Sequence, residues 1–255
     1  MLSVERVSKV YPSLSKGDAP VMALREVTLE VQKNEFCSVL GHSGCGKTTL
    51  LNMIAGFESC TEGKIFCADA QVLRPGADRS MVFQDYALFP WLTVRDNISF
   101  GPRLRGAVEA SDPWVAHLID LVGLTRFASH FPHQLSGGMR QRVSIARALA
   151  VNPTVLLMDE PFAALDAQNR AMMQQEMIRI LNEETKTVVL VTHSIEEAIN
   201  LSDVIIVMTR RPGRVKETIR VPRPRKMSEH SQEYQALKDQ IRELISNEQD
   251  LSDVI

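Results

Sequence analysis

The chain has 255 residues, 44% of them hydrophobic, and a formal charge of −2, which suits one large domain or one domain with a sizeable insertion. This charge gives no argument for nucleic-acid binding. The sequence contains neither the roughly 18 unbroken apolar residues of a membrane helix nor a secretory start nor zinc-like cysteine spacing.

The first part of the chain is typical of β-structure. Apolar residues alternate or cluster in short runs, and glycine- or proline-containing turns separate the runs. The patterns predict strands over residues 2–10, 21–31, 35–40, 63–68 and 80–84, and a helix over residues 48–55.

Residues 85–150 have few strand signals, and we interpret them as a helical insertion with helices over 113–122 and 139–150. Strands and helices alternate again afterwards, with strands predicted over 154–158, 187–192 and 204–209 and helices over 167–184 and 195–201. This alternation predicts an α/β fold with a largely parallel sheet covered on both faces. From Arg210 the chain is basic and punctuated by proline, which indicates a solvated surface tail ending in a helix over 233–246.

Residues 41–48 read Gly-His-Ser-Gly-Cys-Gly-Lys-Thr and match the phosphate-loop pattern GxxxxGK[ST] in full. The match follows a predicted strand and opens a predicted helix, as such loops do. Its glycines allow the backbone to wrap around a phosphate, Lys47 should reach the β- and γ-phosphates, and Thr48 should bind Mg²⁺. The predicted nucleotide-binding residues here are Gly41, His42, Ser43, Gly44, Cys45, Gly46, Lys47, Thr48 and Thr49.

Polar residues follow three of the predicted strands. Asp159 and Glu160 end the apolar run 154–158, which would deliver two acids to the carboxyl edge of the sheet. Asp159 fits a partner of Mg²⁺, and Glu160 fits the general base that orients the attacking water. His193 would bind the γ-phosphate. Gln84 could contact both the metal shell and the attacking water.

The turn Leu135-Ser136-Gly137-Gly138 precedes a helix-forming run and indicates a second anion-binding helix start. One chain with two phosphate cradles suggests that two chains share each nucleotide. Tyr11 follows the first strand and could stack on the base of the nucleotide.

Together these residues resemble the nucleotide-binding subunit of ATP-binding cassette (ABC) transporters, over about residues 1 to 220. The family's motifs occur in order. Residues 41–48 look like the Walker A loop, Gln84 like the Q-loop, 135–139 like the signature, 155–159 like Walker B, Glu160 like the catalytic glutamate, 164–166 like the D-loop, and His193 like the switch histidine.

The resemblance implies a P-loop ATPase core, at 1–84 and 151–220, with an N-terminal antiparallel β subdomain. A helical signature subdomain would span 85–150, and a C-terminal tail with a helix would span 221–255. The family implies ATP and Mg²⁺, with Thr48, Gln84 and Asp159 at the metal. It also implies a head-to-tail dimer, in which ATP on one Walker A loop is closed by the partner's Ser136, Gly137 and Gly138. Asp166 of the D-loop is a further implied ATP-binding residue.

Residues 83–91, 135–149 and 211–214 are also similar to nitrate, sulfonate and taurine importer ATPases, whose relatives include bicarbonate importers. This implies the ATP-hydrolysing subunit of a bacterial importer of a small anion, peripheral on the cytoplasmic face of the inner membrane. The implied partners are a second copy or a related ATPase, an integral-membrane permease and, indirectly, a periplasmic solute-binding protein.

The segment 86–94, with Phe89, Pro90 and Trp91, lies where the family receives a coupling helix from the permease. The alternative for this aromatic cluster is local core packing.

Three positions depart from the wider family's pattern, namely Met139 in the signature, Ala164 in the D-loop and Ser194 after the switch histidine. Two other functions are kept as alternatives. One is a non-transport ABC ATPase, although the chain has neither a long coiled-coil insertion nor a second cassette. The other is an exporter or lipid-transport cassette.

Overall fold

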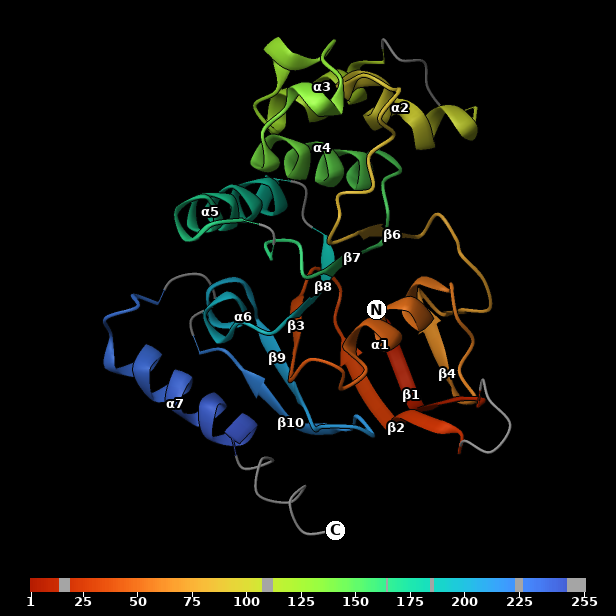
Figure 1. Cartoon of the computed structure of the whole chain (residues 1–255), viewed down its shortest axis with the longest axis vertical. Helices are drawn as coiled ribbons and strands as arrows, with labels where there is room; N and C mark the ends of the chain where they lie inside the picture. The colour runs from red at the N-terminus through yellow and green to blue at the C-terminus, as the bar shows by residue number, and fades with distance from the viewer. Residues whose placement is uncertain (14–18, 107–111, 164, 184–185, 223–226, 247–255) are drawn as a thin grey trace. The chain divides into compact units, whose positions relative to one another are not determined.

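The computed structural model describes residues 1–13, 19–106, 112–163, 165–183, 186–222 and 227–246. Contacts within the chain divide it into two compact units. Unit 1 comprises Met1–Gly76 and Thr187–Ile255, and unit 2 comprises Ala77–Lys186. Figure 1 shows the elements of both units.

Unit 1 contains an antiparallel sheet in the strand order β2-β1-β4-β5. Its strands are β1 (Leu2–Tyr11), β2 (Val21–Val31), β4 (Glu62–Cys67) and β5 (Ala70–Gln71). Much of β2 alternates between exposed and buried side chains, as expected for a strand with one face on the core. The sheet is the antiparallel subdomain that the resemblance implied.

Unit 1 also contains four strands in the order β10-β9-β3-β8. These are β3 (Phe36–Leu40), β8 (Thr187–Thr192), β9 (Val204–Met208) and β10 (Val215–Arg220). Strands β3, β8 and β9 run parallel to one another, and every residue of these three strands is buried. Parallel strands covered on both faces require such continuous apolar runs. Helix α1 (Lys47–Ala55) packs against β8 and β2.

The prediction of a solvated tail after Arg210 is wrong. Strand β10 pairs antiparallel with β9, and helix α7 (Gln232–Ser246) packs against helix α6 (Ile195–Leu201). Ile219 of β10 and Tyr234 and Ile241 of α7 belong to one apolar cluster with residues of β3 and β9. The abundance of basic residues concealed the buried apolar positions Ile219 and Val221, whose spacing of two residues fits a strand with one buried face.

Unit 2 contains the parallel strands β6 (Arg79–Val82) and β7 (Val155–Asp159) and most of the helices. These are α2 (Val94–Leu104), α3 (Pro113–Leu121), α4 (Gly137–Ala150), α5 (Ala167–Glu183) and two short 3₁₀ turns, η1 (Thr125–Phe127) and η2 (Pro132–Gln134). Helix α2 was not predicted, because Gly101 and Pro102 lie inside it. It begins at an N-cap, where the Thr93 hydroxyl accepts from the Asp96 amide.

Among the described residues, no helix is both long enough and apolar enough to cross a bilayer.

Candidate active site

The loop 41–48 joins β3 to α1 in unit 1, as the sequence predicts. Gly44 and Gly46 have φ angles of 76° and 101°, a region that residues with a Cβ rarely occupy. A Cβ at Gly46 would lie 2.6 Å from Leu24 Cδ2, so β2 also leaves no room for a side chain there. The loop is therefore bent tightly over the start of α1, where helix dipole and free N–H groups favour an anion.

Lys47 is buried within this loop, with 5% of its surface exposed. Its ammonium donates hydrogen bonds to the carbonyl oxygens of Gly41, at 2.8 Å, and His42, at 2.9 Å. The His42 ring itself lies 3.2 Å from the carbonyl oxygen of Ile245, in the last turn of α7. Ser43, Gly44 and Thr48 are exposed, whereas the Cys45 side chain is buried. The loop thus offers phosphate-binding groups to solvent while its lysine is held from within.

His193 lies at the same edge of the sheet as this loop. Strands β3 and β8 pair in parallel, with Leu40 opposite Thr192, and the next residue in each strand is Gly41 or His193. His193 is exposed. The sheet register therefore brings the predicted γ-phosphate ligand to the beginning of the phosphate loop.

Tyr11 lies beside helix α1. Its hydroxyl donates a hydrogen bond to Glu58 Oε2 at 2.6 Å, and the oxygen lies 3.4 Å from Thr49 Oγ1. Burial first, and the neighbouring Glu58 carboxylate second, raise the pKa of Tyr11 above its usual value. The Lys9 ammonium lies 5.0 Å from the ring centre. These contacts fix the ring next to Thr49, which follows the phosphate loop, and stacking on a base stays a prediction.

Unit 2 holds the predicted water-positioning groups at one edge of its strand pair. Val82 of β6 is opposite Met158 of β7, and Gln84 and Glu160 each follow two residues later. Gln84 is exposed and Glu160 is partly exposed. Glu160 has a φ of 43°, an uncommon conformation that is often found in active sites.

The side chains predicted at Mg²⁺ are the Thr48 hydroxyl, the Gln84 amide and the Asp159 carboxylate. All three offer oxygen, and Mg²⁺ prefers oxygen ligands, so the donor set fits this ion. Bound Mg²⁺ would neutralise charge on the phosphate oxygens.

The second predicted helix start is also present. Helix α4 begins at Gly137, and the Ser136 hydroxyl accepts a hydrogen bond from the Met139 amide at 3.3 Å. A Cβ at Gly137 would lie 3.4 Å from the Tyr86 hydroxyl, and one at Gly138 would lie 3.9 Å from a methionine sulfur of α5. Because neither glycine carries a side chain, nothing projects from these two positions at the first turn of α4.

Asp166 lies exposed directly before α5, and its carbonyl accepts from the Arg170 amide at 2.8 Å. Ala164 lies outside the described residues. Ser194, which departs from the family's pattern, caps α6 by accepting from the Glu197 amide. Serine and aspartate both serve as N-caps, so the departure keeps this local role.

Arg147 was not singled out from the sequence. Its guanidinium donates to the carbonyl oxygens of Ala87, at 2.7 Å, and Tyr86, at 3.1 Å, and lies 5.5 Å from the centre of the Phe89 ring. Burial lowers the pKa of Arg147. Tyr86 and Ala87 both have positive φ angles, so this arginine fixes an unusual turn just after Gln84 and ties it to α4. The available signal was a charged residue between two alanines in the second half of α4, whose other residues there are mostly apolar.

The aromatic segment 86–94 divides between the two roles that the sequence left open. Phe89 packs against Phe100, with ring centres 4.4 Å apart. The Asn97 side-chain amide accepts a hydrogen bond from the backbone N–H of Phe89 and donates one to the carbonyl oxygen of Phe89. Trp91 is 70% exposed, and Pro90 is exposed too. Phe89 therefore belongs to the local core, whereas Trp91 is available for a partner.

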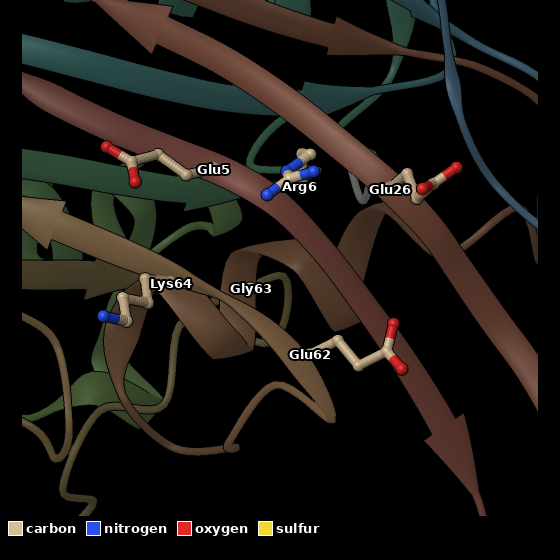
Figure 2. A pocket seen from close by; sticks show the side chains of 6 residues that line it. All are labelled: Glu5, Arg6, Glu26, Glu62, Gly63 and Lys64. Carbon is tan, nitrogen blue, oxygen red and sulfur yellow. The ribbon is translucent and has the colours of Figure 1, made fainter.

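A hollow of about 470 Å³ lies on the antiparallel sheet of unit 1 (Figure 2). It lies over β-bulges, where Arg6, Glu26 and Gly63 have positive φ angles. The Thr28 hydroxyl accepts a hydrogen bond from the Arg6 amide, and the Ser8 hydroxyl accepts one from the Glu26 amide. Its other lining residues, Glu5, Glu62 and Lys64, are exposed and mixed in charge. The hollow is explained by the strand irregularities.

The profile of the ABC transporter family matches residues 24–163 of this chain. An uncharacterised ABC transporter ATP-binding protein of Methanocaldococcus jannaschii is 47% identical over 97% of this chain and 92% of its own length. The taurine import ATP-binding protein of Jannaschia sp. is 51% identical over 87% of this chain and 82% of its own.

Solved structures agree with these relatives. A dimeric ATP-binding cassette in a post-hydrolysis state, bound to ADP and phosphate, is 33% identical with a TM-score of 0.74, covering 88% of this chain and all of that one. The fold and the motifs define an ABC-type ATP hydrolase. The chain belongs to the ABC transporter family, among the ATPases related to nitrate and taurine importers.

Proposed function

We propose that this chain is the ATP-hydrolysing subunit of an importer for a small anion, acting with a separate membrane permease. The hydrolase part rests on the phosphate loop, which is preformed around the buried Lys47 and to whose beginning the sheet register brings His193. The importer part is supported by the taurine import relative, which is 51% identical.

In this proposal each nucleotide is shared between two subunits. The loop 41–48 of one subunit binds the phosphates with Mg²⁺, Tyr11 stacks on adenine, and His193 contacts the γ-phosphate. The partner contributes Ser136, Gly137 and Gly138 from its α4 start and Asp166. The dimeric solved relative, which holds ADP and phosphate, supports such an assembly.

Hydrolysis in this proposal relies on Glu160 as general base and on Gln84 to orient the attacking water. Gln84 and Glu160 each lie two residues after the paired residues Val82 of β6 and Met158 of β7. A movement at the end of one strand would therefore shift the end of the other. Arg147 then links the residues after Gln84 to α4. The nucleotide's state would be transmitted along this route toward Trp91 and the permease at the cytoplasmic face of the membrane.

Co-purification with the permease, followed by ATPase assays with taurine, nitrate or bicarbonate and the solute-binding protein, tests this function. We expect one small anion to raise hydrolysis several-fold. Trp91→Ala should abolish that stimulation while hydrolysis by the isolated subunit stays within about twofold. Leu104→Ala is the matched control, because Leu104 is 74% exposed on α2 of the same unit.

The proposal fails if no permease complex forms, or if Leu104→Ala reduces stimulation as much as Trp91→Ala. An ATPase that no solute stimulates would favour a non-transport function. Stimulation by a lipid or by a solute leaving the cell would favour an exporter.

A further inference from the structure

The turn 209–214, which joins β9 to β10, packs against the phosphate loop from behind. The Gly213 amide donates to the carbonyl oxygen of Ala23 at 2.9 Å, and the Arg25 amide donates to the carbonyl oxygen of Gly213 at 3.0 Å. A Cβ at Gly213 would lie 2.0 Å from the carbonyl oxygen of Cys45. The backbone of the turn therefore touches the backbone of the loop, with no room for a side chain between them.

Arg211 adds a directed contact from this turn. Its guanidinium donates to the carbonyl oxygen of Gly44 from Nε, at 3.3 Å, and from Nη2, at 3.1 Å. That carbonyl belongs to the Gly44–Cys45 peptide group, whose N–H lies on Cys45 and makes a long hydrogen bond of 3.4 Å to the carbonyl oxygen of His42. A cation that bonds the carbonyl polarises the peptide and makes its N–H a stronger donor.

The turn that presents Arg211 is itself held in place by Thr209. The Thr209 hydroxyl accepts from the Arg214 amide at 2.9 Å and lies within hydrogen-bond distance of two carbonyl oxygens, those of Arg210 and Pro212. The Thr209 amide donates to the carbonyl oxygen of Arg214. Arg211 thus reaches Gly44 from a constrained turn rather than from a free chain.

We propose that Arg211 is a positioning residue of the phosphate loop, fixing the Gly44–Cys45 peptide for binding the phosphates of ATP. This rests on the proposed role of the loop 41–48 in nucleotide binding. Arg211 acts through the peptide and touches no nucleotide. It should therefore affect the affinity for nucleotide and leave the hydrolysis step at Glu160 unchanged.

Steady-state kinetics of Arg211→Ala in the full-length protein test this. We expect KM for ATP and Kd for ADP to rise about fivefold, the equivalent of one modest hydrogen bond, with kcat within about twofold. Arg211→Lys should recover part of the affinity, because an ammonium also donates to a carbonyl. Arg214→Ala removes the same charge from the same turn and should leave KM within about twofold.

The positioning role is overturned if Arg211→Ala leaves KM and Kd unchanged, if it lowers kcat alone, or if Arg214→Ala raises KM equally. Lys47→Ala, measured alongside, separates this failure from failure of the proposed nucleotide site. If Lys47→Ala abolishes binding while Arg211→Ala has no effect, only the positioning role is lost. If neither changes affinity, the loop is not the nucleotide site.

Discussion

The two helix starts that carry phosphate-binding character are built differently. The loop before α1 bends through two glycines with positive φ angles, encloses a buried lysine, and is backed by β2 and the turn 209–214. The start of α4 has an ordinary serine N-cap, and Ser136 is exposed. The first is a formed cradle for phosphate. The second is an exposed helix start, which in the proposed dimer would contact the nucleotide bound by the partner subunit.

Glu160→Gln separates binding at both helix starts from hydrolysis. The change removes the proposed base but keeps the size and polarity of the side chain, so kcat should fall by about 10²–10⁴ while ATP affinity is retained. The measurement is phosphate release together with ATP titration and size-exclusion chromatography. An ATP-bound dimer should accumulate, and normal phosphate release would sink the assignment of Glu160.

Gly46→Ala and Gly137→Ala compare the two helix starts directly. At Gly46 the φ is 101° and a Cβ meets Leu24 at 2.6 Å, so ATP affinity of the isolated subunit should fall at least about tenfold. At Gly137 the nearest atom is 3.4 Å away, an ordinary contact. Gly137→Ala should therefore keep the isolated subunit's affinity within about twofold and reduce only hydrolysis by the dimer.

ATP titrations of both variants, with thermal unfolding as a check on folding, decide this comparison. Equal losses of affinity in the isolated subunit would mean that both helix starts serve a nucleotide within one chain.

Tyr11→Ala and Tyr11→Phe test the base-binding side of the first helix start. Loss of the ring should raise Kd for ATP about fivefold, since stacking on a base contributes on the order of 1 kcal/mol or more. Phenylalanine keeps the ring and loses only the hydroxyl contacts with Glu58 and Thr49, so its Kd should stay within about twofold. Isothermal titration measures both, and equal affinities for the alanine variant and the wild type would contradict stacking.

Ser136→Ala should have the smallest effect on the isolated subunit. Removing this N-cap leaves the Met139 amide without its acceptor and should lower the free energy of unfolding by about 1 kcal/mol. ATP affinity of the isolated subunit should not change. Chemical denaturation measures the stability, and a changed affinity would argue against the separation of the two helix starts.

Much of this fold could be predicted because the decisive patterns are local. The buried runs of β3, β7 and β8 and the phosphate loop are contiguous in sequence, so apolar pattern and glycine spacing identify them. Helix α2 and strand β10 were missed because Pro102 and the basic residues after Arg210 mask patterns that only tertiary packing makes stable. The solvated-tail interpretation failed for the same reason.

The candidate site likewise contains some residues that the sequence could predict and others that it could not. Asp159, Glu160 and His193 end or follow predicted strands, and Lys47 belongs to the phosphate-loop pattern, so their positions could be anticipated. Arg147 and Arg211 could not, because each acts on backbone carbonyls at least 60 residues away. Such contacts leave no spacing pattern in the sequence, and only the folded chain reveals them.

Mixed dimers test most directly the claim that the two helix starts complete each other across subunits. One subunit carries Lys47→Ala and the other Gly137→Asp, both with Glu160→Gln to prevent turnover. Each homodimer lacks an intact site, whereas the mixed dimer keeps one, formed by the second subunit's loop and the first subunit's α4 start. The account predicts one trapped ATP per mixed dimer, and a mixed dimer that traps none would contradict it.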